Sequence, residues 1–214
     1  MIQVLIADDH PIVREGLKQV IARDVDMTVA GEALNGQELL DKVYAQPVDV
    51  VVMDFAMPGR SCLDVLKELK RERPKLPVLI LSMYPENELA PRVLKAGAAG
   101  YMTKESAPKE LVQAIRKIHL GGKYVSAALA EKVVLNFATN ANRNPHEELS
   151  DREYQVLIMV ASGKSMQEVA DELSLSIKTV RTYRDRILEK MQIKNVVELT
   201  HYALQHGLIV TRDA

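Results

Sequence analysis

Five polar side chains stand where short apolar runs of this chain stop. Asp8 and Asp9 follow the first run, and Asp54, Ser82 and Lys104 end or follow three later ones. Each run has four to six residues rich in Val, Ile and Leu, which is typical of a strand buried on both faces of a sheet. The carboxyl ends of parallel strands meet at one edge, where open α/β sheets bind ligands. We therefore expect these side chains to share one pocket.

A pocket that holds three carboxylates needs a counter-charge, because like charges repel strongly where the dielectric constant is low. Carboxylate oxygens favour a hard cation, and Mg²⁺ suits a site with few protein ligands and a phosphate better than Ca²⁺ does. We predict Mg²⁺ at Asp8, Asp9 and Asp54, with Lys104 facing a bound anion. Each aspartate taken singly has another interpretation, since Asp also caps helices and begins turns. A cap, however, requires neither a paired aspartate nor a lysine on another strand.

Strand and helix patterns alternate over the first 120 residues. This alternation predicts an α/β fold, doubly wound, with a five-stranded parallel sheet and right-handed crossovers. Pro11 lies in the first turn of an expected helix, Asn35 opens the next, and Pro74 follows the end of the third, as helix signals do. Strands are expected near residues 2–7, 28–32, 48–53, 78–82 and 100–103, and helices near 11–22, 35–45, 62–72, 86–96 and 108–120.

Residues 1–120 resemble the receiver domain of two-component response regulators. The resemblance rests on the segments LIADDHPIVREGL, VVMDFAMPG, LILS and AAGYMTK. It implies that Asp54 is the phosphoacceptor. It also implies that Asp9, Asp54 and the backbone carbonyl of Ala56 hold Mg²⁺, with Asp8 supporting the ion through water.

The same resemblance assigns Lys104 to the phosphoryl group, and Ser82 with Tyr101 to a switch pair. After phosphorylation the hydroxyl moves to a phosphoryl oxygen, and the aromatic ring fills the space that it leaves. The phosphate donor is then a phosphohistidine of a sensor histidine kinase. Such a site is a switch rather than an enzyme, with only slow self-phosphorylation from small donors and autodephosphorylation. A phosphatase with an aspartyl-phosphate intermediate needs a general acid two residues after the nucleophile, where this chain has Ala56.

Length and composition indicate two domains of an intracellular globular protein. At 214 residues the chain exceeds the usual size of one domain. No apolar run is long enough to cross a bilayer, and no signal peptide is evident, so we expect the chain to stay in the cytoplasm. Its single cysteine, Cys62, excludes a disulfide within the chain. Because the net charge is −1, an interaction with nucleic acid must depend on the local distribution of charge.

The period of the apolar residues becomes helical in the second part of the chain. We predict a receiver domain over 1–120, a linker over 121–148 that includes a helix near 126–137, and a second domain over 149–214. Ser150 and Glu153 have the spacing of a capping box. Four helices with a brief turn between the second and third predict an all-α helix-turn-helix domain.

The third of these helices carries a basic stripe. Between Lys178 and Lys194 there are six basic residues and two acidic ones, which is typical of a helix that faces phosphates. The alternative is a solvated face with pairs four residues apart, such as Arg181 with Asp185. The preceding tight turn favours DNA, because it sets the helix in the geometry that fits a major groove.

This second part resembles the LuxR-type helix-turn-helix, and the whole chain resembles a response regulator of the NarL/FixJ subfamily. The resemblance implies double-stranded DNA at promoter sites as a partner, and a homodimer on activation. We expect phosphorylation to shift the population from a closed form to one that dimerises on DNA. The candidate dimer contact is the apolar stripe of the last helix, which is wider than a small bundle buries; a role only in the core of the domain is the alternative. The stripe consists of Val196, Val197, Leu199, Ala203 and Leu204. The alternative is a regulator that binds DNA independently of phosphate and uses the receiver only as a dimerisation scaffold. The expected DNA contacts are Lys178, Thr179, Arg181, Thr182, Tyr183, Arg184, Asp185 and Lys190.

Overall fold

The computed structural model describes residues 1–84, 86–126, 129 and 144–209. The chain divides into two compact units, Met1–Ala127 and Ala128–Ala214, and each is described by itself. The helix predicted near residues 126–137 falls almost wholly outside the described residues. Within the described ranges, no helix is long and apolar enough to cross a membrane.

The first unit contains a parallel sheet, as predicted. Its strand order is β2-β1-β3-β4-β5, and every neighbouring pair is parallel. From β1 the chain passes to β2 at one edge of the sheet. After β2, each connection takes the chain toward the opposite edge, through β3 and β4 to β5, so the direction reverses between β1 and β3. This reversal is the place where an open α/β sheet binds its ligand. The strands are β1 Ile2–Ala7, β2 Met27–Ala33, β3 Val50–Asp54, β4 Val78–Ser82 and β5 Gly100–Thr103.

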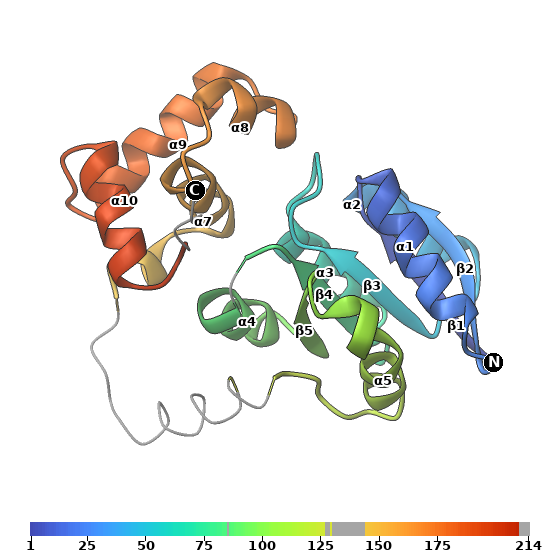
Figure 1. The fold of residues 1–214 in the computed structure, drawn as a ribbon. Helices are drawn as coiled ribbons and strands as arrows, with labels where there is room; N and C mark the ends of the chain where they lie inside the picture. The colour runs from blue at the N-terminus through green and yellow to red at the C-terminus, as the bar shows by residue number, and fades with distance from the viewer. Residues whose placement is uncertain (85, 127–128, 130–143, 210–214) are drawn as a thin grey trace. The chain divides into compact units, whose positions relative to one another are not determined.

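Helices cover both faces of this sheet (Figure 1). With right-handed crossovers, the reversal of strand order places α1 on the face opposite to α2, α3 and α4. α1 and α5 pack together over strand residues such as Ile6 and Val52, and Leu17, Ile21 and Ile115 complete that core. The helices are α1 Pro11–Ala22, α2 Gly36–Ala45, α3 Cys62–Glu72, α4 Glu86–Lys95 and α5 Ala107–His119.

The second unit is helical in its described part, and a polar cap begins each α-helix within residues 144–209. Ser150 accepts from the backbone N–H of Glu153 in a complete capping box, as predicted. Ser165, Ser176 and Asn195 accept in the same way from residues three positions later, which satisfies donors that have no partner inside the helix. The elements are the 3-10 helix η1 Pro145–Glu148, α7 Asp151–Ala161, α8 Met166–Glu172, α9 Ile177–Lys190 and α10 Val196–Gln205.

The segment expected to be a linker is ordered at its described ends. His146 in η1 is only 2% exposed, and its Nδ1 lies 2.7 Å from the hydroxyl of Tyr202 on α10. Near the other end, Tyr124 pairs with β5. The sequence signalled neither contact, because a single turn or a single bridge is too short to produce an apolar period.

Candidate functional site

Three of the predicted residues meet at the carboxyl ends of the strands. Asp8 follows β1 and Asp54 ends β3, so the two stand on either side of the reversal in strand order. Lys104 follows β5, and its Nζ lies 2.7 Å from Asp8 Oδ2 and 2.8 Å from Asp54 Oδ2. The lysine therefore forms ion pairs with two carboxylates that come from different strands.

Burial gives this cluster its electrostatic character. Asp54 is 3% exposed and Asp8 is 1% exposed. Burial raises the pKa of Asp54 to about 6; Lys104 opposes that rise, and the charge of Asp8 adds to it. Burial lowers the pKa of Lys104, but the two carboxylates outweigh it, and the net change is upward. The site therefore holds more negative charge than one lysine can balance well, and an added cation would be favourable.

The donor atoms fit a hard cation. One carboxylate oxygen from each of Asp8, Asp9 and Asp54, together with a ring nitrogen of His10, lies within 4.8 Å of the others. Asp8 Oδ2 and Asp9 Oδ1 are buried without a hydrogen bond. The contact of Asp8 Oδ2 with Lys104 is an ion pair that lacks hydrogen-bond geometry. Buried carboxylate oxygens that accept no hydrogen bond are the feature that a bound Mg²⁺ would satisfy.

His10 belongs to this cluster, and the sequence interpretation missed it. Its Nδ1 lies 2.9 Å from Asp9 Oδ1 and 3.3 Å from Asp8 Oδ1. Its backbone N–H also donates to Asp8 Oδ1 at 2.8 Å. A ring nitrogen therefore lies close to the predicted carboxylate ligands. The position of His10 directly after Asp9 was a signal that the sequence offered.

Ser82 and Tyr101 meet at the loop that follows β4. The Ser82 hydroxyl accepts from the backbone N–H of Tyr84 at 3.1 Å. The Tyr101 hydroxyl donates to the carbonyl of Tyr84 at 2.7 Å, and Tyr101 is 0% exposed. Burial raises the pKa of Tyr101 above its usual range, and the nearby Ser82 hydroxyl opposes that rise. Both residues expected to form a switch therefore contact one loop residue, with the aromatic ring already inside.

The loop after β3 contacts Asp54 through its backbone. The N–H of Ala56 donates to Asp54 Oδ1 at 3.3 Å, and that of Phe55 donates to the carbonyl of Leu81 at 2.8 Å. Cys62, at the start of α3, is 2% exposed, so its thiol is a buried side chain rather than part of the acidic cluster.

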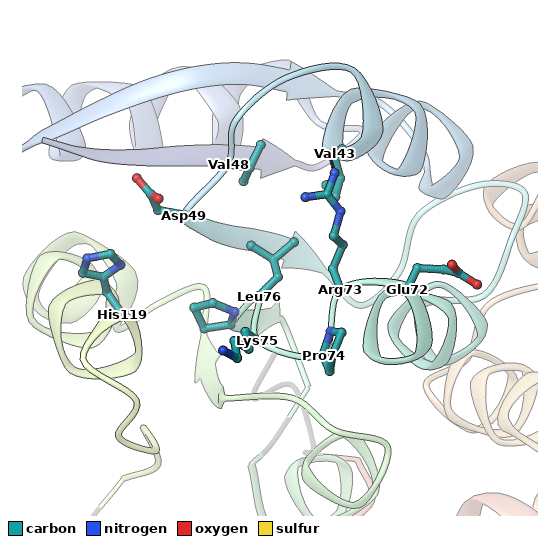
Figure 2. Close-up of a pocket in the computed structure, with 10 residues that line it drawn as sticks. Val43, Val48, Asp49, Glu72, Arg73, Pro74, Lys75, Leu76 and His119 are labelled. Atoms are coloured by element: carbon teal, nitrogen blue, oxygen red, sulfur yellow. Dashed lines mark hydrogen bonds between the residues drawn. The ribbon is translucent and has the colours of Figure 1, made fainter.

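A hollow at the other end of the sheet contains none of the predicted site residues (Figure 2). Its volume is about 480 Å³. Asp49 and Pro77, which precede β3 and β4, line it, so it lies at the amino ends of the strands. Ligands of open α/β sheets bind at the opposite ends, and the acidic cluster is therefore the better candidate site.

The basic stripe of α9 is accessible at its amino-terminal turns. The structure contains no pair between Arg181 and Asp185, because Asp185 binds Arg184 at 2.6 Å instead. Neither Lys178 nor Arg181 forms an ion pair with a residue that the structure describes. The predicted DNA contacts divide into exposed Lys178, Arg181, Thr182, Asp185 and Lys190, and half-buried Thr179, Tyr183 and Arg184.

Lys190 has a partner within its own unit. Its Nζ lies 2.7 Å from Oε2 of Glu153, which is buried on α7. The backbone N–H and hydroxyl of Ser150 donate to the same oxygen. The ion pair therefore fastens α9 to α7, a role that the charge pattern of one helix does not reveal.

Two family models match the chain. Residues 4–116 match the response regulator receiver domain, and residues 147–203 match the luxR family of bacterial regulatory proteins. Among curated proteins, the chain is 41% identical to response regulator GacA of Pseudomonas viridiflava over 211 residues, which are 98% of each chain. It is 37% identical to response regulator UvrY of Escherichia coli K12 over 209 residues, covering 97% of this chain and 96% of that one.

Solved structures of RcsB from Salmonella have a similar fold. One superposes with a TM-score of 0.71 at 26% identity, covering 97% of this chain and 98% of that one. Another, bound to the promoter rprA in the presence of the phosphomimetic BeF₃⁻, superposes with a TM-score of 0.66 at 27% identity, covering 94% and 97%.

Proposed function

This chain belongs to the response regulators of the NarL/FixJ type, which join a receiver domain to a luxR-type helix-turn-helix domain, and we propose that phosphorylation of Asp54 controls its binding to DNA. As a transcription factor, it acts by binding rather than by turning over a substrate. The observation that carries the proposal is the position of Asp54, buried between Asp8 and Lys104 where the strand order reverses.

The chemistry required of the protein is mainly positioning and charge neutralisation. A carboxylate oxygen of Asp54 forms the new bond to phosphorus while the bond to the donor's imidazole nitrogen breaks and the imidazole leaves. Lys104 then balances charge on the transferred phosphoryl oxygens. Asp8, Asp9 and Asp54, with the carbonyl of Ala56, are the residues that would hold Mg²⁺. Bound there, the ion supplies further positive charge opposite the same oxygens.

Phosphorylation adds roughly −1.5 to −2 of charge at neutral pH. That charge lies beside the β4–α4 loop, where Ser82 and Tyr101 both contact Tyr84. We propose that the Ser82 hydroxyl turns to donate to a phosphoryl oxygen. The hydrogen bond that it accepts from the Tyr84 N–H is then weakened or broken. Such a local change can shift a population between two arrangements that differ by only a few kcal/mol.

We propose that α9 is the helix that enters the major groove. The exposed cations Lys178 and Arg181 stand in its first turns, where recognition helices contact DNA. Asp185 already pairs with Arg184, so that region of the helix carries less free positive charge. The first turns therefore supply most of the attraction to phosphates.

α10 is proposed as the dimer contact. Leu199 and Ala203 are buried in the helical unit, whereas Val197 is 71% exposed and Leu204 is 38% exposed. Two exposed apolar side chains on one short helix remain to be covered by a second copy when the protein is phosphorylated.

The dimer contact is tested by making both side chains polar, as Val197→Asn with Leu204→Gln. Sedimentation of the full chain with Mg²⁺ and beryllofluoride should show weaker self-association, because the apolar area no longer gains from burial. The control is Val25→Asn, at an 88% exposed position of the receiver unit. Unchanged association of the double variant, with its folding intact, would reject α10 as the interface.

The acceptor assignment is tested by Asp54→Ala. We expect Mg²⁺-dependent phosphorylation of the full chain by a small phosphodonor, measured by intact-protein mass, to disappear. Asp49→Ala is the matched control, since Asp49 lies at the opposite end of β3. Persistent labelling of the Asp54 variant would show that the acceptor is a different residue.

A further inference from the structure

The chain beyond α5 returns to the free edge of the sheet. Residues 122–126, here named the edge segment, form a parallel bridge between Tyr124 and Gly100 of β5. The N–H of Tyr124 donates to the carbonyl of Ala99 at 3.0 Å, and the N–H of Tyr101 donates to the carbonyl of Tyr124 at 3.0 Å. The segment therefore pairs with the strand that carries Tyr101.

Side chains fasten the edge segment to the helices on both sides of β5. Glu86, the first residue of α4, accepts from the backbone N–H of Ser126 at 2.9 Å. On α5, the Glu110 carboxylate binds the Tyr124 hydroxyl, and Lys117 Nζ lies 5.8 Å from the centre of the Tyr124 ring. The contacts join one short segment to α4, β5 and α5.

Gly100 leaves the space that this pairing occupies. A Cβ at position 100 would lie 2.7 Å from the carbonyl oxygen of Tyr124 and 2.9 Å from its Cβ. Both separations are shorter than a Cβ atom tolerates in proteins. The first involves a backbone carbonyl, which cannot rotate away as a side chain can. A glycine within a strand often marks such a close approach. Any other residue at this position would force the backbone of the edge segment or of β5 to shift.

We propose that the edge segment is the coupling element that transmits the state of the Asp54 site from β5 and α4 to the chain that leads to the DNA-binding unit. It is docked in the unphosphorylated protein and loosened by phosphorylation. The inference rests on the proposed function of Asp54, and it deepens it by naming the part of the fold that responds.

Tyr101 is the physical connection. Its hydroxyl is bound to the Tyr84 carbonyl in the β4–α4 loop, and its backbone N–H is bound to Tyr124 in the edge segment. Glu86 stands just after the same loop and holds Ser126. A movement of that loop toward a phosphoryl group therefore acts on two of the hydrogen bonds that dock the segment.

The first test is hydrogen exchange of individual amides in the full chain, with Mg²⁺ and with or without beryllofluoride. The amides of Tyr101, Tyr124 and Ser126 should exchange faster when beryllofluoride is bound, because the bonds that protect them are loosened. The amide of Val51, bonded to Pro77 at 3.0 Å, is the internal reference. Equal protection of the three amides in both states would overturn the proposal.

The second test uses reciprocity. If a bound phosphoryl mimic weakens docking of the edge segment by some factor, then undocking the segment must strengthen binding of the mimic by that same factor. Gly100→Ala should therefore bind beryllofluoride roughly fivefold more tightly or better, as measured by fluorine NMR with Mg²⁺ present. Gly16→Ala is the matched control, since a Cβ at position 16 meets nothing within 4 Å.

A second pair of variants keeps the test sound if Gly100→Ala does not fold. Tyr124→Pro removes the N–H that bonds Ala99, whereas Tyr124→Phe removes only the hydroxyl that binds Glu110. The proline variant should behave as Gly100→Ala does, and the phenylalanine variant should stay close to the parent. Unchanged affinity in both undocking variants would reject the edge segment as a coupling element. A parent chain that binds no beryllofluoride would instead reject the function proposed for Asp54.

Discussion

Lys104 is the residue on which the charge balance of the acidic cluster depends. It is the partner of both Asp8 and Asp54, and its side chain is only 9% exposed. In such a buried site a fixed positive charge stabilises developing negative charge more strongly than it would in water. We therefore expect the role of Lys104 to be electrostatic, so that an uncharged side chain of the same length would not replace it.

Lys104→Met, which keeps the length and removes the charge, should slow phosphorylation by a small donor about a hundredfold or more. The rate is measured from the mass of the intact protein at saturating Mg²⁺. Lys109→Met, at an exposed position of α5, is the control. A rate within twofold of the parent would show that Lys104 does not act on the phosphoryl group.

At the scale of elements, one ion pair joins two helices of the DNA-binding unit. Burial raises the pKa of Glu153, but hydrogen bonds from Lys190 and Ser150 outweigh it, so that the pKa lies below its ordinary value of 4.5. A lowered pKa in the folded state means that the ionised form stabilises the fold. That stability is present above about pH 4.5 and is lost as the pH falls through the folded-state pKa.

Glu153→Gln keeps the shape and removes the charge. At pH 7 it should lower the free energy of unfolding of this unit by about 1 kcal/mol, since Lys190 is partly exposed to solvent. The difference between parent and variant should shrink as the pH falls below 4.5. Urea unfolding at pH 7 and at pH 4 measures both values, with exposed Glu189→Gln as the control. A difference that does not depend on pH would contradict the role of the ion pair.

At the scale of the whole molecule, phosphorylation and DNA binding must be coupled for the chain to act as a switch. The competing hypothesis, in which the receiver serves only as a scaffold, predicts the same DNA affinity in both states. Because binding to DNA depends on salt through the number of phosphates contacted, affinity and salt slope together distinguish the two hypotheses.

Beryllofluoride with Mg²⁺ should raise the affinity of the full chain for the genomic DNA fragments that it binds. The expected increase is roughly five- to 150-fold at a fixed salt concentration. Lys178→Ala should lower the slope of log affinity against log salt concentration by about one. It should not change the ratio of the affinities with and without beryllofluoride. Lys18→Ala, whose parent residue pairs with Glu32 in the receiver unit, should leave both quantities unchanged. Equal affinity with and without beryllofluoride would favour the scaffold hypothesis.

The sequence by itself determined the elements and the types of side chain available for chemistry. Continuous apolar runs, helical periods of 3.6 residues and helix caps all depend on residues that are close in the sequence. The five strands of the sheet, the caps such as Ser150 and the polar ends of the strands were therefore predictable. These polar ends include Asp54 and Lys104.

Only the tertiary structure decided which of these residues meet. The strand order puts Asp8 beside Asp54, and the loop between β1 and α1 brings His10 into the cluster. The packing of α7 on α9 places Lys190 next to Glu153. The docking of Tyr124 beside Gly100 joins chain segments that no local period connects. Such contacts depend on chain packing and loop closure over many residues, and short-range sequence patterns carry no record of them.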